Sequence, residues 1–112
     1  MLSHEKLDAY QLAIKFFALS ANLVQRFPRG HAALADQLKR AALSVPLNIA
    51  EGNGKPGAID KSRFYGIARG SAFECGALLD ACKILGLADD TDFETGKSLL
   101  TRVVSMLTKM CR

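Results

Sequence analysis

The sequence contains no tryptophan, only two histidines and three cysteines, and no apolar run close to the roughly 20 residues that cross a bilayer. Three cysteines without a pairing pattern give no disulfide framework and favour a reducing compartment. Residues 1–10 lack a basic region followed by an apolar core, so we expect no secretory signal. These absences together predict a cytoplasmic protein without a membrane span.

The length and composition are those of an ordinary globular chain. At 112 residues the chain can bury roughly two-thirds of its unfolded surface in one domain, which we expect to span residues 1–112. Hydrophobic residues make up 49% of it and charged residues 23%, which leaves little room for disorder. No segment alternates apolar and polar residues as a strand does, so the sequence predicts an all-α protein.

Apolar residues recur at helical spacings of three and four in four segments. We expect helices from about Glu5 to Phe27, from near His31 to Glu51-Gly52, from an N-cap at Asp60 to Gly86, and from the acidic cluster at residues 89–94 onward. Short connections rich in proline and glycine join them, so successive helices run in opposite directions. The expected fold is an antiparallel up-and-down four-helix bundle.

The second helix contains a proline in an otherwise regular apolar pattern. Leu34, Leu38, Ala41 and Val45 form its seam, and apolar residues continue beyond Pro46. We interpret this as one helix kinked at Pro46, at a cost of about 3 kcal/mol that packing offsets. The alternative is a helix that stops at Ser44 and is followed by a turn. We expect the far end of the helix to carry a left-handed glycine cap at Gly52.

The first helix has an apolar face that covers well over half of its circumference. Its two adjacent stripes are Leu12, Phe16, Leu19 and Leu23, and Ala13, Phe17, Val24 and Phe27. An outer helix of a monomeric bundle needs a narrower apolar face, so the surplus predicts contact with another subunit.

The third helix has a heptad seam of mostly small residues. The seam consists of Phe64, Ala68, Ser71, Cys75, Leu78, Cys82 and Leu85, with Gly66, Gly70 and Gly76 beside it. Small residues let helices approach closely. We therefore expect the outer stripe of the first helix and the glycine-rich face of the third to hold an oligomer together. The inner face of the fourth helix is expected to consist of Phe93, Leu100, Val103, Val104, Leu107 and Met110.

Positive charge is concentrated in the middle of the chain. Residues 26–69 hold eight basic and three acidic residues, an excess of five positive charges. Such a surface can meet the phosphates of a nucleic acid, and the alternative is a merely solvated face. The candidate nucleic-acid-binding residues are Arg26, Arg29, Lys39, Lys55, Lys61, Arg63 and Arg69.

Two carboxylates, Glu51 and Glu74, lie among small apolar neighbours in the sequence. A buried carboxylate must be paired or hydrogen-bonded, and Arg40 and Asn48 are the candidate partners. We favour a structural polar network of Arg40, Asn48, Glu51 and Glu74 that sets the helix register, over a general acid and base pair. No nucleophile arrangement accompanies the carboxylates, so no catalytic residue is predicted.

Other chemistry finds little support. The loop GNGKPG has the wrong spacing for a phosphate-binding loop and follows no strand. Cys75 and Cys82 are seven residues apart, about 10.5 Å along a helix, which is too far for a disulfide. We expect both to be core residues, Cys111 to be a free thiol, and no metal or cofactor to bind.

The residues 37–52, QLKRAALSVPLNIAEG, resemble the "four helix bundle protein" family. Phe27-Pro28 upstream and Phe64-Tyr65, Ala68 to Ser71, Glu74 and Leu85-Gly86 downstream extend the resemblance over nearly the whole chain. Members of this family include proteins encoded in intervening sequences of bacterial large-subunit ribosomal RNA genes. The sequence departs from the family pattern at Tyr10, where a tryptophan is common, and in the loop NGKPGAI, where Lys55 is the nearest match to a basic residue.

The resemblance implies a ring-shaped homopentamer without enzymatic activity. Related bundles, the accessory variability determinant proteins of diversity-generating retroelements, bind a reverse transcriptase and nucleic acid. We therefore expect a non-enzymatic, homo-oligomeric protein that binds RNA or DNA through a basic surface. The alternative is a protein-interaction scaffold, or an accessory subunit of a nucleic-acid enzyme, without direct nucleic-acid contact.

Overall fold

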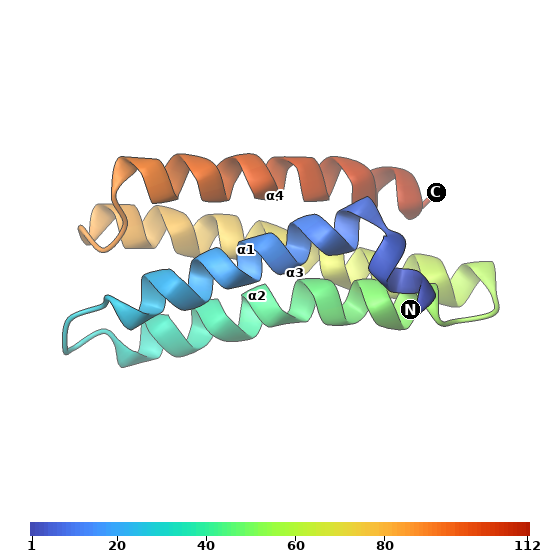
Figure 1. Ribbon diagram of the computed structural model, residues 1–112, viewed down its shortest axis with the longest axis horizontal. Helices are drawn as coiled ribbons and strands as arrows, with labels where there is room; N and C mark the ends of the chain where they lie inside the picture. The colour runs from blue at the N-terminus through green and yellow to red at the C-terminus, as the bar shows by residue number, and fades with distance from the viewer.

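Four helices run alternately up and down along the long axis of the molecule (Figure 1). They are α1 (Asp8–Gln25), α2 (Ala32–Asn53), α3 (Ala58–Ile84) and α4 (Asp90–Met110), and the short 3₁₀ helix η1 (Ser3–Lys6) precedes them. This computed structural model describes the backbone of residues 1–112 and every side chain except that of Lys6. No strand occurs within that backbone. The predicted all-α up-and-down bundle is confirmed.

Each helix packs on its two neighbours in the bundle, so that α1 contacts both α2 and α4, and α3 contacts the same two helices from the other side. The resulting body measures 45 × 24 × 21 Å. The connections α1–α2 and α3–α4 lie at one end, and the α2–α3 connection lies at the other end, near both chain termini (Figure 1).

Helix α2 is continuous through Pro46, which is buried, so the interpretation as one helix is confirmed and the alternative end at Ser44 is wrong. A kink at Pro46 stays a prediction. The structure contradicts the left-handed cap at Gly52, because Gly52 lies within the helix and is buried. A Cβ atom at this position would lie 2.8 Å from Cε1 of Tyr65. The glycine therefore permits the close approach of α3, and does not end α2.

The other helix ends follow capping chemistry with one correction. Gly57, and not Asp60, is the N-cap of α3, and Asp60 lies in the first turn, where its carboxylate suits the helix dipole. Asp89 caps α4 by accepting the Asp92 N–H at 2.7 Å. Gly86 ends α3 as predicted, with φ +72°, and the bonds Leu87 N–H to Cys82 O and Gly86 N–H to Lys83 O form a Schellman motif.

The first turns of α3 bind the ends of two other helices. Lys61 Nζ donates to the Asn53 carbonyl oxygen at 2.8 Å, at the C-terminal end of α2. Ser62 Oγ donates to the Cys111 carbonyl oxygen at 2.7 Å, at the C-terminal end of α4. Both acceptors are carbonyls that a helix leaves without an internal partner.

The core contradicts the idea that α1 has apolar surface to spare. Leu12, Ala13, Phe16 and Leu23 are buried, and Phe17, Leu19, Val24 and Phe27 are half-buried. The bundle's own α2 and α4 cover the wide face, since α1 packs on both. The argument for a second subunit on α1 is therefore wrong.

The buried side of α3 is rotated from the predicted seam. Ala68, Cys75 and Cys82 are buried as expected, but the rest of the buried set is Tyr65, Ala72 and Leu79. Leu85 is 54% exposed. Leu100, Val103 and Leu107 of α4 are fully within the core, and the predicted Phe93, Val104 and Met110 pack against its edge.

Candidate interaction surfaces

Large apolar side chains are exposed mainly on two of the four helices. On α2 and α3 they are Leu43, Leu47, Ile59, Ile67, Phe73 and Ile84, which we call the α2/α3 face. Helix α1 exposes only Ile14 among its large apolar side chains, and the described side chains of α4 include none. The exposed apolar surface therefore lies mainly on α2 and α3, and not on α1, where the sequence pattern had placed it.

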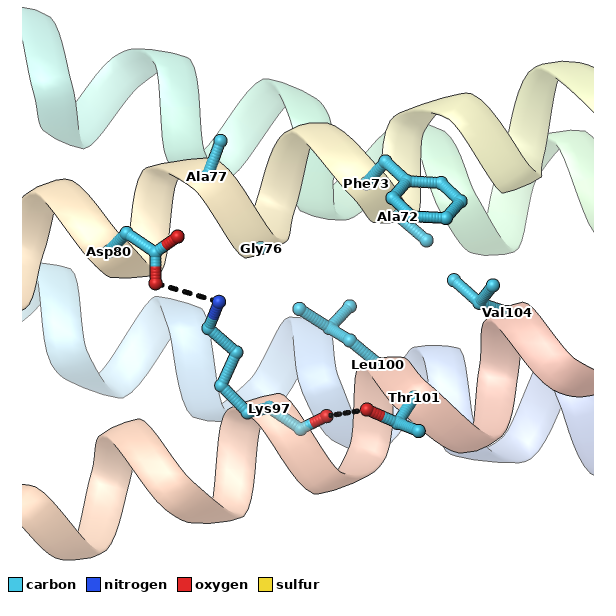
Figure 2. A pocket seen from close by; sticks show the side chains of 9 residues that line it. All are labelled: Ala72, Phe73, Gly76, Ala77, Asp80, Lys97, Leu100, Thr101 and Val104. Carbon is cyan, nitrogen blue, oxygen red and sulfur yellow. Dashed lines mark hydrogen bonds and ion pairs between the residues drawn. The ribbon is translucent and has the colours of Figure 1, made fainter.

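The three glycines of the predicted glycine-rich face of α3 do not share one environment. Gly66 and Gly70 are exposed, and a Cβ atom on either would meet nothing within 4 Å. Gly76 instead faces α4 and lines a groove between α3 and α4 (Figure 2). The open backbone at Gly66 and Gly70 leaves room for another helix to approach.

The groove between α3 and α4 has a volume of about 480 Å³. Its lining consists of Ala72, Phe73, Gly76, Ala77, Asp80, Lys97, Leu100, Thr101 and Val104. Lys97 Nζ pairs with Asp80 Oδ1 at 2.7 Å at one end, and Phe73 lies toward the other end (Figure 2). An apolar floor with a few polar groups at one end is typical of binding grooves.

A cluster of cations beside this groove holds α3 and α4 together. Lys83 Nζ lies 3.3 Å from Asp90 Oδ1 and 4.3 Å from the centre of the Phe93 ring. Lys97 Nζ approaches the same ring to 5.3 Å. Both lysines are thus occupied within the chain by carboxylates and an aromatic face.

The seven basic residues predicted to bind nucleic acid do not form one surface, and four of them make contacts within the chain. Arg26 donates to Asp92 Oδ2 at 2.6 Å, and this hydrogen bond raises the pKa of Arg26 above its ordinary value. Lys61 caps α2. Arg69 donates to Thr108 Oγ1 at 2.9 Å, and Lys55 lies 3.9 Å from Glu51 and over the Phe64 ring.

The other three, Arg29, Lys39 and Arg63, are exposed and have no ion pair among the described side chains. Arg29 lies in the α1–α2 connection, whereas Arg63 lies near the start of α3 at the opposite end of the bundle (Figure 1). A single nucleic-acid site cannot include both without running along most of the molecule.

Sequence reasoning missed a second set of cations. Lys15 of α1 and Arg102 of α4 line one polar hollow of about 200 Å³, together with Asp8, Gln11 and Leu12. The two cations are 87 positions apart in the chain, and only the packing of α1 on α4 brings them together. Both cations lie outside residues 26–69, where charge counting located the basic excess.

The predicted polar network is not assembled within the chain. Glu51 and Glu74 are exposed, which contradicts the expected burial. Glu74 accepts from Gln37 Nε2 at 2.5 Å, and Asn48 donates to the Ser44 carbonyl oxygen at 2.8 Å.

A second hydrogen bond between α2 and α3 joins Ser44 Oγ and Ser71 Oγ at 2.8 Å. The two carboxylates are thus solvent-exposed on separate helices, and Glu51 has Lys55 as its ion-pair partner at 3.9 Å.

Two of the three thiols lie in the core. Cys75 and Cys82 are buried as predicted, and burial raises the pKa of Cys75 to about 12. The reactive form of a cysteine is the thiolate, so a thiol with this pKa is a poor nucleophile. Among the described residues, no group of three histidine, cysteine, aspartate or glutamate side chains has an arrangement that could hold a metal ion. No described helix is both long and apolar enough to cross a membrane.

The fold and surfaces define an antiparallel four-helix bundle protein with an exposed apolar face. The family model of the 23S rRNA-intervening sequence protein matches residues 5–109. The chain therefore belongs to this family, as its resemblance to proteins of ribosomal RNA intervening sequences predicted.

One similar solved structure is a protein of unknown function from the S23 ribosomal protein family of Bacteroides thetaiotaomicron VPI-5482. It has 17% sequence identity and a TM-score of 0.85, covering 93% of this chain and 98% of that chain. At this identity the likeness shows the fold alone. No curated protein gives a significant match.

Proposed function

We propose that the chain is a non-enzymatic bundle that assembles with copies of itself and acts as a scaffold. The observation that carries the proposal is the α2/α3 face, where six large apolar side chains are exposed on neighbouring helices. Large apolar side chains that remain in water on two adjacent helices favour contact with a second chain, because association would bury them. The open backbone at Gly66 and Gly70 supports close approach of a second helix.

The proposed assembly is a ring, and the family resemblance favours five copies. Multi-angle light scattering of the purified chain over a wide concentration series tests this proposal. We expect a mass that is a fixed multiple of 12.1 kDa and that persists on dilution. A single-chain mass at every concentration would overturn the proposal.

A second candidate function is contact with the phosphate backbone of RNA or DNA. The shared hollow of Lys15 and Arg102 supports it, together with the exposed Arg29, Lys39 and Arg63. Contacts of these cations with phosphates carry no sequence information, so binding should be tolerant of sequence and strongly weakened by salt.

Fluorescence anisotropy with a short single-stranded RNA at low and moderate salt tests this second function. The variant carrying Lys15→Ala and Arg102→Ala should weaken binding and lower the slope of log affinity against log salt by about 1.4, for two lost phosphate contacts. The variant with Arg29→Ala, Lys39→Ala and Arg63→Ala tests the other cations in the same way. If the wild-type chain does not bind at low salt, the function is a scaffold alone.

The absence of enzymatic activity is part of the proposal, and the exposed carboxylates and the buried Cys75 thiol with its raised pKa support it. The proposed location is the cytoplasm, where three free thiols stay reduced.

A further inference from the structure

The exposed side of α2 carries a short ridge whose chemistry matches the groove between α3 and α4. We define the α2 ridge as Arg40, Leu43 and Leu47, which are spaced by three and four residues and therefore lie on one side of the helix. Leu43 is 41% exposed and Leu47 is 57% exposed. Arg40 is exposed and makes no ion pair or hydrogen bond among the described side chains.

The groove presents complementary groups in the same spacing. Phe73 and Asp80 lie toward opposite ends of its α3 wall, with Gly76 between them (Figure 2). They are seven residues apart, about 10.5 Å along the helix, and so are Arg40 and Leu47. The ridge therefore has a cation at one end and leucines beyond it, and the groove has a carboxylate at one end and an apolar wall beyond it.

Two features of the groove are unexplained by packing within one chain. Gly76 lies in the middle of α3, where glycine lowers helix propensity, yet the nearest atom to a Cβ at this position would be Lys97 Nζ at 3.9 Å. Its own chain thus has room for alanine. The Asp80 side chain pairs with Lys97 through Oδ1 and is still 56% exposed, so a second cation can reach the same carboxylate.

We propose that the α2 ridge of one copy docks into the α3–α4 groove of another copy. In this arrangement Leu47 packs against Phe73, Leu43 lies over the notch at Gly76, and Arg40 reaches Asp80. The docked α2 runs antiparallel to the α3 that receives it. The inference rests on the proposed self-assembly and specifies its interface.

This contact has a geometric consequence, because the two complementary surfaces are different parts of one molecule. Each copy offers one ridge and one groove, so the interface is heterologous and generates a closed ring or an open filament. An isologous dimer through the exposed apolar face would instead place the same residues opposite each other and stop at two copies.

A charge reversal tests the pairing of Arg40 with Asp80. Arg40→Glu and Asp80→Lys should each weaken association by at least about tenfold, measured as the concentration at which light scattering shows half of the chains assembled. The double variant carrying both changes should recover most of this loss. Double-variant association no better than that of the single variants would overturn the proposed register.

Leu47→Asp tests the ridge, with Leu85→Asp as the matched control, because the two leucines are 57% and 54% exposed. The first should abolish assembly and the second should leave it intact. Gly76→Leu fills the notch from the groove side and should also abolish assembly. Circular dichroism melting of each variant at low concentration verifies that the bundle still folds.

The outcomes separate the interface from the assembly itself. A wild-type chain that is monomeric at every concentration overturns both. A wild-type oligomer that tolerates Leu47→Asp and Gly76→Leu overturns this interface and leaves self-assembly in place. Loss of assembly with Leu47→Asp but not with Gly76→Leu overturns the groove as the docking site.

Discussion

Helices α1 and α3 show how differently two apolar sequences can be used in one bundle. Helix α1 has the broader apolar pattern, yet Ile14 is the only one of its described large apolar side chains that is exposed. Helix α3 has the cleaner heptad seam, yet Ile59, Ile67, Phe73 and Ile84 are exposed on it. The wide apolar face of α1 is therefore covered by α2 and α4 within the bundle, and its width does not indicate surface left for a partner. The apolar surface that a partner could contact depends on the residues that each helix turns away from the bundle core.

The largest test of this comparison exchanges a phenylalanine on each helix for alanine. Phe16 of α1 is 1% exposed, so Phe16→Ala should lower the free energy of unfolding by about 3–5 kcal/mol through lost burial and a cavity. Phe73 of α3 is 56% exposed, and Phe73→Ala should change the free energy of unfolding by less than about 1 kcal/mol. Urea unfolding at low protein concentration measures both. Similar losses for the two variants would contradict the assignment of α1 to the core.

Two glycines, Gly52 on the buried side of α2 and Gly70 on the exposed side of α3, allow a second comparison. Gly52→Ala brings a Cβ to within 2.8 Å of the Tyr65 ring, and we expect a loss of about 1–3 kcal/mol from overpacking. The matched change Gly70→Ala meets open space and should gain up to about 1 kcal/mol from helix propensity. Thermal melting compares the two, and a stabilised Gly52→Ala variant would show that Tyr65 moves aside freely.

The buried side of α3 also predicts a loss of stability at high pH. Because burial raises the pKa of Cys75 from 9.0 to about 12, the unfolded chain loses this proton at lower pH than the folded chain. The contribution of the protonated Cys75 thiol to the free energy of unfolding is complete below pH 9 and falls by up to about 1.4 kcal/mol per pH unit above it. Urea unfolding of the wild-type chain and of Cys75→Ala from pH 8 to pH 10.5 isolates this contribution. Equal pH slopes for the two would contradict it.

The smallest expected effect concerns the start of α4. Asp89→Ala removes the side chain that accepts the Asp92 N–H at 2.7 Å, and we expect a loss of about 1 kcal/mol. Asp89→Asn retains the acceptor and should recover most of this loss. Thermal melting of both variants separates capping from the charge of the acidic cluster, which would be responsible if Asn behaves like Ala.

The helices themselves were predictable because they depend on local periodicity. The continuity of α2 through Pro46, the end of α3 at Gly86 and the acidic start of α4 all follow from neighbouring residues. The role of Gly52 was not predictable in this way, because it depends on Tyr65 of another helix. Its place before the loop resembles a cap, and only the packing of α3 on α2 reveals a close approach.

The candidate surfaces were less accessible to sequence reasoning. Charge counting found an excess in residues 26–69, but it cannot show that Arg26 pairs with Asp92 or that Lys61 caps α2. Small neighbours in the sequence suggested burial of Glu51 and Glu74, yet both lie on outward positions of their helices. The hollow that joins Lys15 to Arg102 arises only from packing of distant segments.

The adjacent residues Lys61 and Ser62 fasten the last carbonyls of two different helices from a single turn of α3. Terminal turns of helices normally fray at little cost in free energy, so their amide protons exchange quickly. The last turns of α2 and α4 are both bound by this one turn of α3. Disrupting the first turns of α3 should therefore speed amide exchange in the last turns of both helices. This end of the bundle should therefore unfold cooperatively, although it contains both chain termini.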